Sequence, residues 1–197
     1  MKYWQVIAVF LLGTCVGLLG IDLSSIGLKG YTLLDFVLMA LIFLIGLDLG
    51  RMRLKIGHRH LKISIVLIAS TFIGSLIGGL LCYLLLKSPY AIPVALGSGW
   101  YSYTAARVFR VSVRWGAIAL IANMLRELLC MLLYPLTKGS LREAFISVGG
   151  ATTMDTTLPI IRLHAGEETS LIAFIHGFIV TLLVPVLVEA AIELISP

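Results

Sequence analysis

Apolar stretches of about membrane-spanning length follow one another along the chain. A transmembrane helix needs roughly 20 mostly apolar residues to cross a bilayer. Because lipid cannot hydrate unpaired backbone groups, and because no stretch alternates with the period of a strand, these stretches are predicted to be helices. We expect an all-α polytopic membrane helix bundle that forms a single domain over residues 1–197. Its seven expected segments are about 4–21, 31–49, 62–86, 91–109, 115–136, 144–161 and 169–192.

The composition agrees with a chain whose main solvent is lipid. Of its residues, 59% are hydrophobic and 13% are charged, and the mean hydropathy is +1.05. That is more apolar surface than one soluble core of this size can bury. The formal net charge of +5 does not indicate nucleic-acid binding, because the basic residues lie in short gaps between the apolar stretches.

Two of these gaps are strongly basic. Gap 51–62 carries Arg51, Arg53, Lys55, Arg59 and Lys62, and gap 107–114 carries Arg107, Arg110 and Arg114. Loops rich in lysine and arginine usually lie on the cytoplasmic side. With both gaps in the cytoplasm, seven crossings put the N-terminus inside and the C-terminus outside. A re-entrant segment near 97–104 or 149–159 would change the count.

The three cysteines, Cys15, Cys82 and Cys130, lie within apolar stretches and lack the spacing of metal ligands. This placement favours the interpretation that the cysteines are small buried hydrophobic residues. We expect no disulfide framework, no metal site and no cofactor.

The stretch 149–159, GGATTMDTTLP, interrupts the sixth apolar segment. In a continuous helix, Pro159 would lack the N–H that bonds to the carbonyl of Asp155, and Gly149 and Gly150 allow the backbone to unwind. Broken helices bind substrates and ions near the midplane of secondary transporters, so this stretch predicts such a site. The alternative is a kinked helix packed through small residues, which leaves a buried aspartate unexplained. The hydroxyl groups expected to bind water, substrate or exposed backbone are those of Thr152, Thr153, Thr156 and Thr157.

The motif NMLRE lies halfway along the fifth segment. Arg126 and Glu127 diverge by about 100° on a helix, while Asn123 is a neighbour of both. Ionisable groups within a span are costly and usually mark function. We expect Glu127 to face a cavity as a second cation or proton group. Arg126 either pairs with an acid on another helix or receives a carboxylate of the substrate.

The stretch 97–104, GSGWYSYT, predicts a second discontinuous element. Gly97 and Gly99 loosen the backbone. Ser98 and Ser102 can hydrogen-bond a polar ligand. The aromatic rings of Trp100 and Tyr101 either contact an ammonium group or anchor the chain at the membrane interface.

His176 lies at the centre of the last segment, in FIHGF. It either relays protons or bonds to a neighbouring helix. A third interpretation pairs it with Ser98 as the dyad of an intramembrane hydrolase. That interpretation leaves Asp155 and Glu127 without a role, so we do not expect an enzyme.

The chain resembles the LysO lysine-exporter family of bacterial and archaeal membrane proteins. The resemblance rests on FLIGLDLGR (43–51), ALGSGWYS (95–102), NMLREL (123–128) with a following proline, GGATTMDTTLP (149–159) and HGFIVTLLVPVL (176–187). It implies a prokaryotic cytoplasmic membrane protein that exports L-lysine, and its analogues, in exchange for protons or sodium. Carried over by motif position, Glu127 and Asp155 become the leading transport residues.

One departure from the family is expected. Typical members carry further hydrophobic spans before the region that corresponds to residue 1 here. We therefore expect a separate small membrane subunit that supplies these helices, or a homo-oligomer. The alternative to a transporter is a structural subunit of a larger membrane complex that does not itself transport.

Overall fold

The computed structural model describes residues 15, 27–28, 31–32, 47 and 57–195. The chain divides into two compact units, Met1–Arg51 and Met52–Pro197. In the first unit, strand β1 (Gly27–Leu28) pairs with strand β2 (Tyr31–Thr32) in an antiparallel ladder. The predicted segments 4–21 and 31–49 and the motif FLIGLDLGR fall almost entirely outside the described residues.

Three long helices form the frame of the second unit. They are α3 (His58–Leu86), α6 (Val113–Leu133), which the 3₁₀ helix η2 (Tyr134–Leu136) extends, and α8 (Leu158–Ile195). All three are long and apolar enough to cross a membrane. The predicted helical membrane bundle is thus confirmed for this unit.

Helix α3 illustrates how the sequence divides its faces. Its buried residues recur every three or four positions, which is the spacing of one helix face. The opposite face exposes large aliphatic side chains such as Ile73, Leu76 and Leu84, as expected for contact with lipid. The buried face consists of Ser64, Leu67, Thr71, Ser75 and Gly79.

The fourth predicted segment is not one straight helix. It consists of α4 (Ala91–Leu96) and α5 (Tyr101–Phe109), joined by a turn in which Ser98 and Gly99 have φ of 45° and 93°. The ring of Tyr90, before α4, lies 6.3 Å from that of Trp115, and Phe109, at the end of α5, packs on Gly116. Both ends of residues 91–109 therefore lie at the first turn of α6, and we call this segment hairpin 1.

The sixth predicted segment also folds back. Hairpin 2 comprises α7 (Leu141–Gly149), the 3₁₀ helix η3 (Gly150–Met154) and the first part of α8, residues 158–165. Gly166, with φ 80° and ψ −175°, interrupts α8 after this part. The guanidinium of Arg142, at the start of α7, donates a hydrogen bond to the carbonyl of His164. The start of the first arm of hairpin 2 and the end of its second arm therefore lie side by side.

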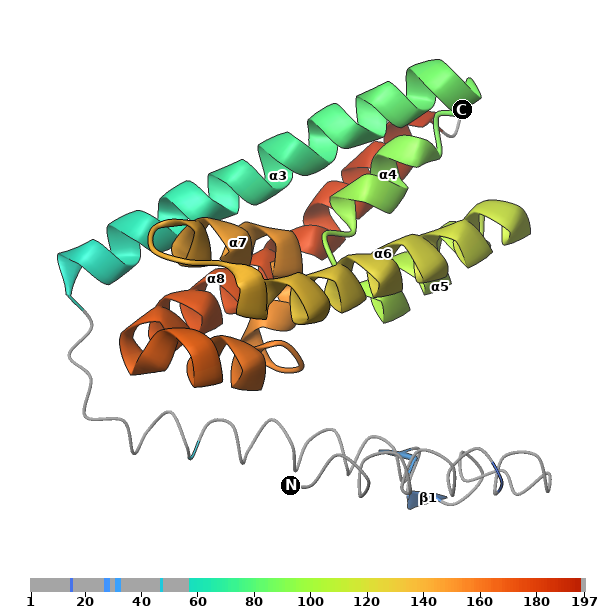
Figure 1. Ribbon diagram of the computed structural model, residues 1–197. Coiled ribbons are helices and arrows are strands. Elements are labelled where there is room, and N and C mark those ends of the chain that lie inside the picture. The colour runs from blue at the N-terminus through green and yellow to red at the C-terminus, as the bar shows by residue number, and fades with distance from the viewer. Residues whose placement is uncertain (1–14, 16–26, 29–30, 33–46, 48–56, 196–197) are drawn as a thin grey trace. The chain divides into compact units, whose positions relative to one another are not determined.

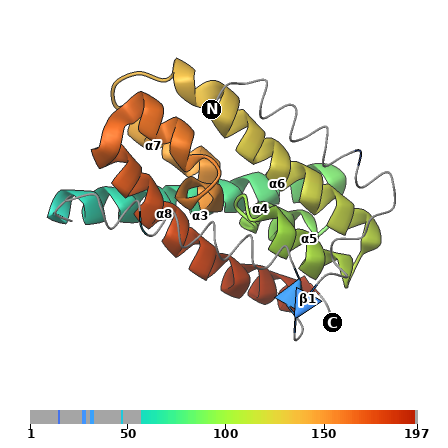
Figure 2. The same cartoon turned by 90° about the horizontal axis from the view of Figure 1, so that it is seen from below.

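The two hairpins enter the bundle from opposite ends (Figures 1 and 2). At one end, Arg59 of α3 forms ion pairs with Glu143 of hairpin 2 and with Glu168 of α8. At the other end, Arg107 of hairpin 1 pairs with Glu189, far along the same helix α8. Each hairpin thus returns to the end of the bundle from which it enters, and the count of seven crossings stays unconfirmed.

This arrangement corrects one expectation about the loops. Because hairpin 1 returns to its own end, Arg107 and Arg59 lie at opposite ends of the part of α8 that follows Gly166. The expectation that Arg59 and Arg107 lie on the same side therefore does not hold for this bundle. The hydropathy of residues 91–109 resembles that of a crossing helix because both arms of the hairpin are apolar.

Candidate functional site

The tips of the two hairpins meet in the middle of the bundle. The backbone N–H of Ala151 donates a hydrogen bond of 2.8 Å to the carbonyl of Ser98. A Cβ atom on Gly150, which has φ 63°, would collide with this same carbonyl. A Cβ on Gly99 would lie 2.7 Å from the carbonyl oxygen of Gly149. The predicted helix-breaking glycines thus allow two backbones to touch.

Asn123 of α6 holds the tip of hairpin 1. Its Oδ1 accepts a hydrogen bond of 2.8 Å from the N–H of Gly99, and its Nδ2 donates to the carbonyls of Val94 and Ala119. The side chain is 3% exposed, so water does not replace these bonds. Asn123 therefore bonds to the backbone of α4 and to that of the first break.

Arg126, one turn further along α6, holds hairpin 2. Its guanidinium donates to the carbonyls of Val148 and Ser147, at the C-terminal end of α7, at 2.7 and 2.9 Å. It also donates to the hydroxyl of Ser75 on α3 at 2.9 Å. A cation at this position compensates the unpaired carbonyls and the negative dipole at the end of a helix. Its partners within residues 57–195 are carbonyls and a hydroxyl rather than an acid.

Two carboxylates lie near the place where the two hairpin tips meet. Glu127 comes from α6 and Asp155 from the break of hairpin 2, and both are half-buried. They lie within electrostatic range of each other, and the hydroxyl of Tyr101, the first residue of α5, lies within range of both. Neither carboxylate forms an ion pair with a basic group in the described part of the chain. Within residues 57–195 no cation therefore neutralises these two acids.

The remaining polar groups of the second break mostly support its backbone. Thr152 and Thr157 donate to carbonyls within the break, those of Gly149 and Thr152. Thr156 is exposed, and its N–H donates to Oδ1 of Asp155 at 2.6 Å. The carbonyl of Asp155 accepts a bond of 3.3 Å from the N–H of Leu158. The expectation that Pro159 orphans this carbonyl does not hold, because α8 begins at Leu158 and the proline occupies its first turn, where it is tolerated.

His176 bonds to two other elements. Its Nε2 lies 2.9 Å from the hydroxyl of Thr71 on α3, and its Nδ1 lies 3.0 Å from that of Thr153 in η3. The hydroxyl of Ser98 bonds instead to that of Ser75, at 3.1 Å. Ser98 and His176 therefore do not form the dyad of a hydrolase.

Comparison with known proteins identifies the family of this chain. The family model described as "Lysine exporter LysO" matches residues 7–192. The chain belongs to the LysO family. This is a family of exporters, which are transporters and not enzymes.

Two relatives carry names that agree with this membership. "Lysine exporter LysO" of Escherichia coli (strain K12) is 32% identical over 177 residues, which are 83% of this chain and 58% of that protein. "Putative lysine exporter" of Haemophilus influenzae is 33% identical over 156 residues, which are 77% of this chain and 80% of that protein. No solved structure matches the chain. The chain thus spans less than two thirds of the length of its Escherichia coli relative.

The LysO-family motifs of the second unit form the two hairpin tips and the elements that contact them. ALGSGWYS forms the tip of hairpin 1, NMLREL carries Asn123, Arg126 and Glu127 of α6, and GGATTMDTTLP forms the tip of hairpin 2. HGFIVTLLVPVL begins with the histidine that contacts this tip. These four motifs of the second unit therefore meet at one place in the fold.

The aromatic residues of hairpin 1 divide between two places. Tyr101 lies toward the acids, as described above. Trp100 packs on Tyr103, with ring centroids 5.1 Å apart, and the hydroxyl of Tyr103 donates to Glu189 of α8 at 2.9 Å. Trp100 thus belongs to the contact of hairpin 1 with α8, while Ser102 is exposed.

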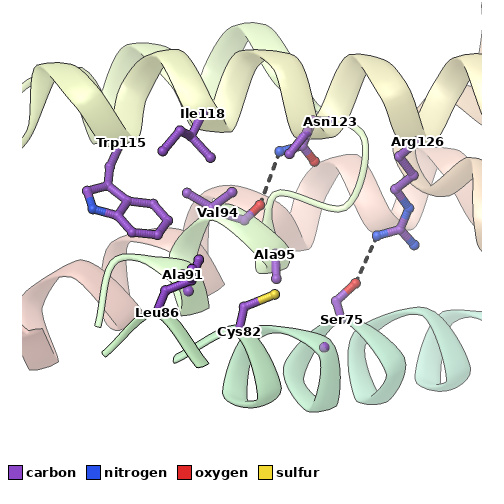
Figure 3. Close-up of a pocket in the computed structure, with 12 residues that line it drawn as sticks. Ser75, Cys82, Leu86, Ala91, Val94, Ala95, Trp115, Ile118, Asn123 and Arg126 are labelled. Carbon is purple, nitrogen blue, oxygen red and sulfur yellow. Dashed lines mark hydrogen bonds between the residues drawn. The ribbon is translucent and has the colours of Figure 1, made fainter. Parts of the chain in front are cut away.

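A cavity of about 340 Å³ lies between α3, α4 and α6 (Figure 3). Its walls are mostly apolar, with Leu86 and Trp115 toward one end and Asn123, Arg126 and Ser75 at the other. A second cavity of about 330 Å³ shares Ser75 and Arg126 and extends toward Ser147 of α7. Arg126 and its bond to Ser75 thus form a common wall between two cavities.

Sequence reasoning missed two residues, Thr71 and Ser75, and one contact, that of Tyr103 with Glu189. Thr71 and Ser75 bond to His176 and Arg126, and Tyr103 joins Glu189. A signal for the first two was present, since Ser64, Thr71 and Ser75 fall on one face of an otherwise apolar helix. No signal indicated the contact of Tyr103, because its partner lies 86 residues away.

Proposed function

We propose that this chain exports L-lysine from the cytoplasm by proton antiport, with Glu127 and Asp155 as the groups that bind either lysine or protons. The observation that carries the proposal is a pair of half-buried acids, from two different elements, at the crossing of two broken hairpins. Neither acid has a basic partner in residues 57–195. The family and the names of the relatives favour lysine as the cation that neutralises them.

The charges of lysine suit such a pair. Lysine carries two ammonium groups, so that each carboxylate can receive one of them. Isolated charges in a membrane interior are costly, and a carboxylate there is stabilised by a bound cation or by protonation. Lysine and protons therefore compete for the same two carboxylates. This competition is the basis of exchange.

The third charge of lysine, its carboxylate, is assigned to the start of α5. Tyr101 lies beside both acids, and the first N–H groups of a helix attract anions. Arg126 is assigned a supporting role instead, because three of its N–H groups already bind Ser75, Ser147 and Val148. Thr156 and Ser102, both exposed near the tips, are assigned hydrogen bonds to the substrate.

Exchange provides the energy for export. Moving one positive charge out of an inside-negative cell costs about 2.3 kcal/mol per 100 mV. Exchange of one proton for one lysine cation is electroneutral, so that the pH gradient alone drives it. Exchange of two protons, one for each carboxylate, makes the voltage a further driving force.

The two opposed hairpins support alternating access. In many secondary transporters, discontinuous elements from opposite sides meet at the substrate site and move relative to the remaining helices. We assign the gap 51–62 to the cytoplasm, because it carries five basic residues against three in the gap 107–114. Hairpin 2 then enters from the cytoplasm, hairpin 1 enters from outside, and α8 ends outside.

Transport in inside-out vesicles, from a host that lacks its own lysine exporter, tests the proposal. Labelled lysine should accumulate when an outward-directed proton gradient is imposed, and a sodium gradient alone should have no effect. The response to an imposed voltage distinguishes one proton from two. Accumulation driven only by sodium contradicts proton antiport. No accumulation under any gradient favours a structural subunit.

A further inference from the structure

His176 is completely buried, with 0% of its surface exposed, yet it does not touch the two acids of the site. Its two ring nitrogens bond to hydroxyl groups from two other elements, Thr71 of α3 and Thr153 of η3. Neutral imidazole has one donor and one acceptor nitrogen, and a hydroxyl group can serve as either partner. The ring thus joins α3, α8 and hairpin 2 through two hydrogen bonds.

The segment that His176 holds is the one that carries Asp155. Thr153 lies in η3, two residues before Asp155, which begins the irregular segment between η3 and α8. The hydroxyl of Thr153 also lies within bonding distance of the carbonyls of Gly150 and Ala173, at 2.8 and 2.9 Å. Irregular backbone lacks the regular bonds of a helix, so its position depends on such tertiary contacts.

Close packing accompanies these bonds. A Cβ atom on Gly177, the residue after His176, would collide with the N–H of Met154, and it would lie 2.6 Å from the hydroxyl of Thr153. Helix α8 therefore touches the backbone immediately before Asp155. A small displacement of this contact changes the distance between Asp155 and Glu127.

A role as proton relay to the acids has less support. The charged side chain that acts electrostatically on the ring is Arg126 rather than Asp155 or Glu127. Both ring nitrogens are already occupied by threonine hydroxyls. The contacts of His176 therefore fix geometry.

We propose that His176 is a positioning residue: through Thr153 it sets the place of Asp155 relative to Glu127 and so the affinity for lysine. The inference rests on the proposed function, since it assumes that Asp155 binds the substrate. Because Thr153 bonds to Nδ1, an asparagine at 176 reaches it with its amide, whereas leucine fills similar space and forms no hydrogen bond. The hydroxyl of Thr153 is removed by Thr153→Val and kept by Thr153→Ser.

The test measures KM, maximal rate and pH profile of lysine transport in vesicles. Both His176→Leu and Thr153→Val remove the hydrogen bond between these two residues, and we expect each to raise KM about tenfold. The double variant should be no worse than either single one, because both remove the same contact. His176→Asn and Thr153→Ser should restore most of the affinity and keep the wild-type pH profile.

Several outcomes overturn the inference. One is a KM for the leucine variant equal to that of the wild type. Another is loss of proton coupling in His176→Asn to the same degree as in His176→Leu, which indicates a relay. If the leucine variant does not insert, the comparison of Thr153→Val with Thr153→Ser decides by itself. Asp155→Asn, measured in parallel, separates the two proposals. If Asp155→Asn transports lysine normally, the proposed function fails. If Asp155→Asn loses transport while His176→Leu and Thr153→Val keep the wild-type KM, only the role of His176 is rejected.

Discussion

The N–H of Ala151 donates a 2.8 Å hydrogen bond to the carbonyl of Ser98, and this bond joins two hairpins that enter from opposite ends of the bundle. Both partners are backbone groups. A Cβ atom on Gly150 would collide with this carbonyl, and one on Gly99 would lie 2.7 Å from the carbonyl oxygen of Gly149. The contact therefore depends on the glycines beside it more than on any polar side chain.

The first prediction concerns Gly150. In Gly150→Ala the new Cβ collides with the carbonyl of Ser98, at a φ of 63° that also disfavours alanine. The tips must separate, so we expect lysine transport to fall at least about tenfold. The measurement is lysine accumulation in vesicles, normalised to the amount of inserted protein.

Gly78→Ala is the matched control for this change. Gly78 lies within α3, and no atom lies within 4 Å of a Cβ added there. Alanine also stabilises a helix relative to glycine. We expect transport by this variant to equal that of the wild type. An equal loss of transport in both alanine variants contradicts the role assigned to the contact between the hairpin tips.

The second prediction concerns the direction of the hairpins. In a variant without native cysteines, single cysteines replace Ser88 and Val111, on the two sides of hairpin 1, and Lys138 and Leu163, on the two sides of hairpin 2. We expect Ser88→Cys and Val111→Cys to react with an impermeant thiol reagent from one side of the membrane. Lys138→Cys and Leu163→Cys should react from the other side.

Straight crossings give a different result. If residues 91–109 cross the membrane, positions 88 and 111 become reactive from opposite sides. The same holds for positions 138 and 163. Labelling of intact cells and of inside-out vesicles distinguishes these patterns for each hairpin separately.

The third prediction concerns Asn123. In Asn123→Leu the N–H of Gly99 and the carbonyl of Val94 lose a buried partner. Such a loss costs about 2 kcal/mol, which corresponds to a decrease of about 4–8 °C in the unfolding midpoint. Thermal unfolding in detergent measures it. Ser70→Ala serves as the control, because the exposed hydroxyl of Ser70 bonds, among residues 57–195, to the carbonyl of Val66 in its own helix. A similar decrease in both variants contradicts the assigned role.

The sequence indicated where the backbone breaks but not where the chain goes afterwards. Glycines 97, 99, 149 and 150 and Pro159 marked both breaks, and both exist. The reversal of direction depends on tertiary contacts of the turn residues, such as the bond of Asn123 to Gly99. Hydropathy does not report this, since an apolar hairpin and an apolar crossing have the same composition.

The polar residues of α6 show the same limit. Their importance followed from the cost of polar groups in lipid. Their partners did not, because Arg126 bonds to main-chain carbonyls that become available only when α7 ends at Gly149. The expected accessory subunit or homo-oligomer stays a prediction.

The central claim is tested most directly by measuring lysine and proton movement together in Asp155→Asn. Asparagine keeps the size of the side chain but can neither carry a charge nor exchange a proton. The account predicts that the variant inserts normally, that a pH gradient no longer drives lysine movement, and that lysine no longer releases protons. Glu127→Gln should impair both movements at least about tenfold. Unchanged lysine flux coupled to protons in the Asp155 variant would contradict the account.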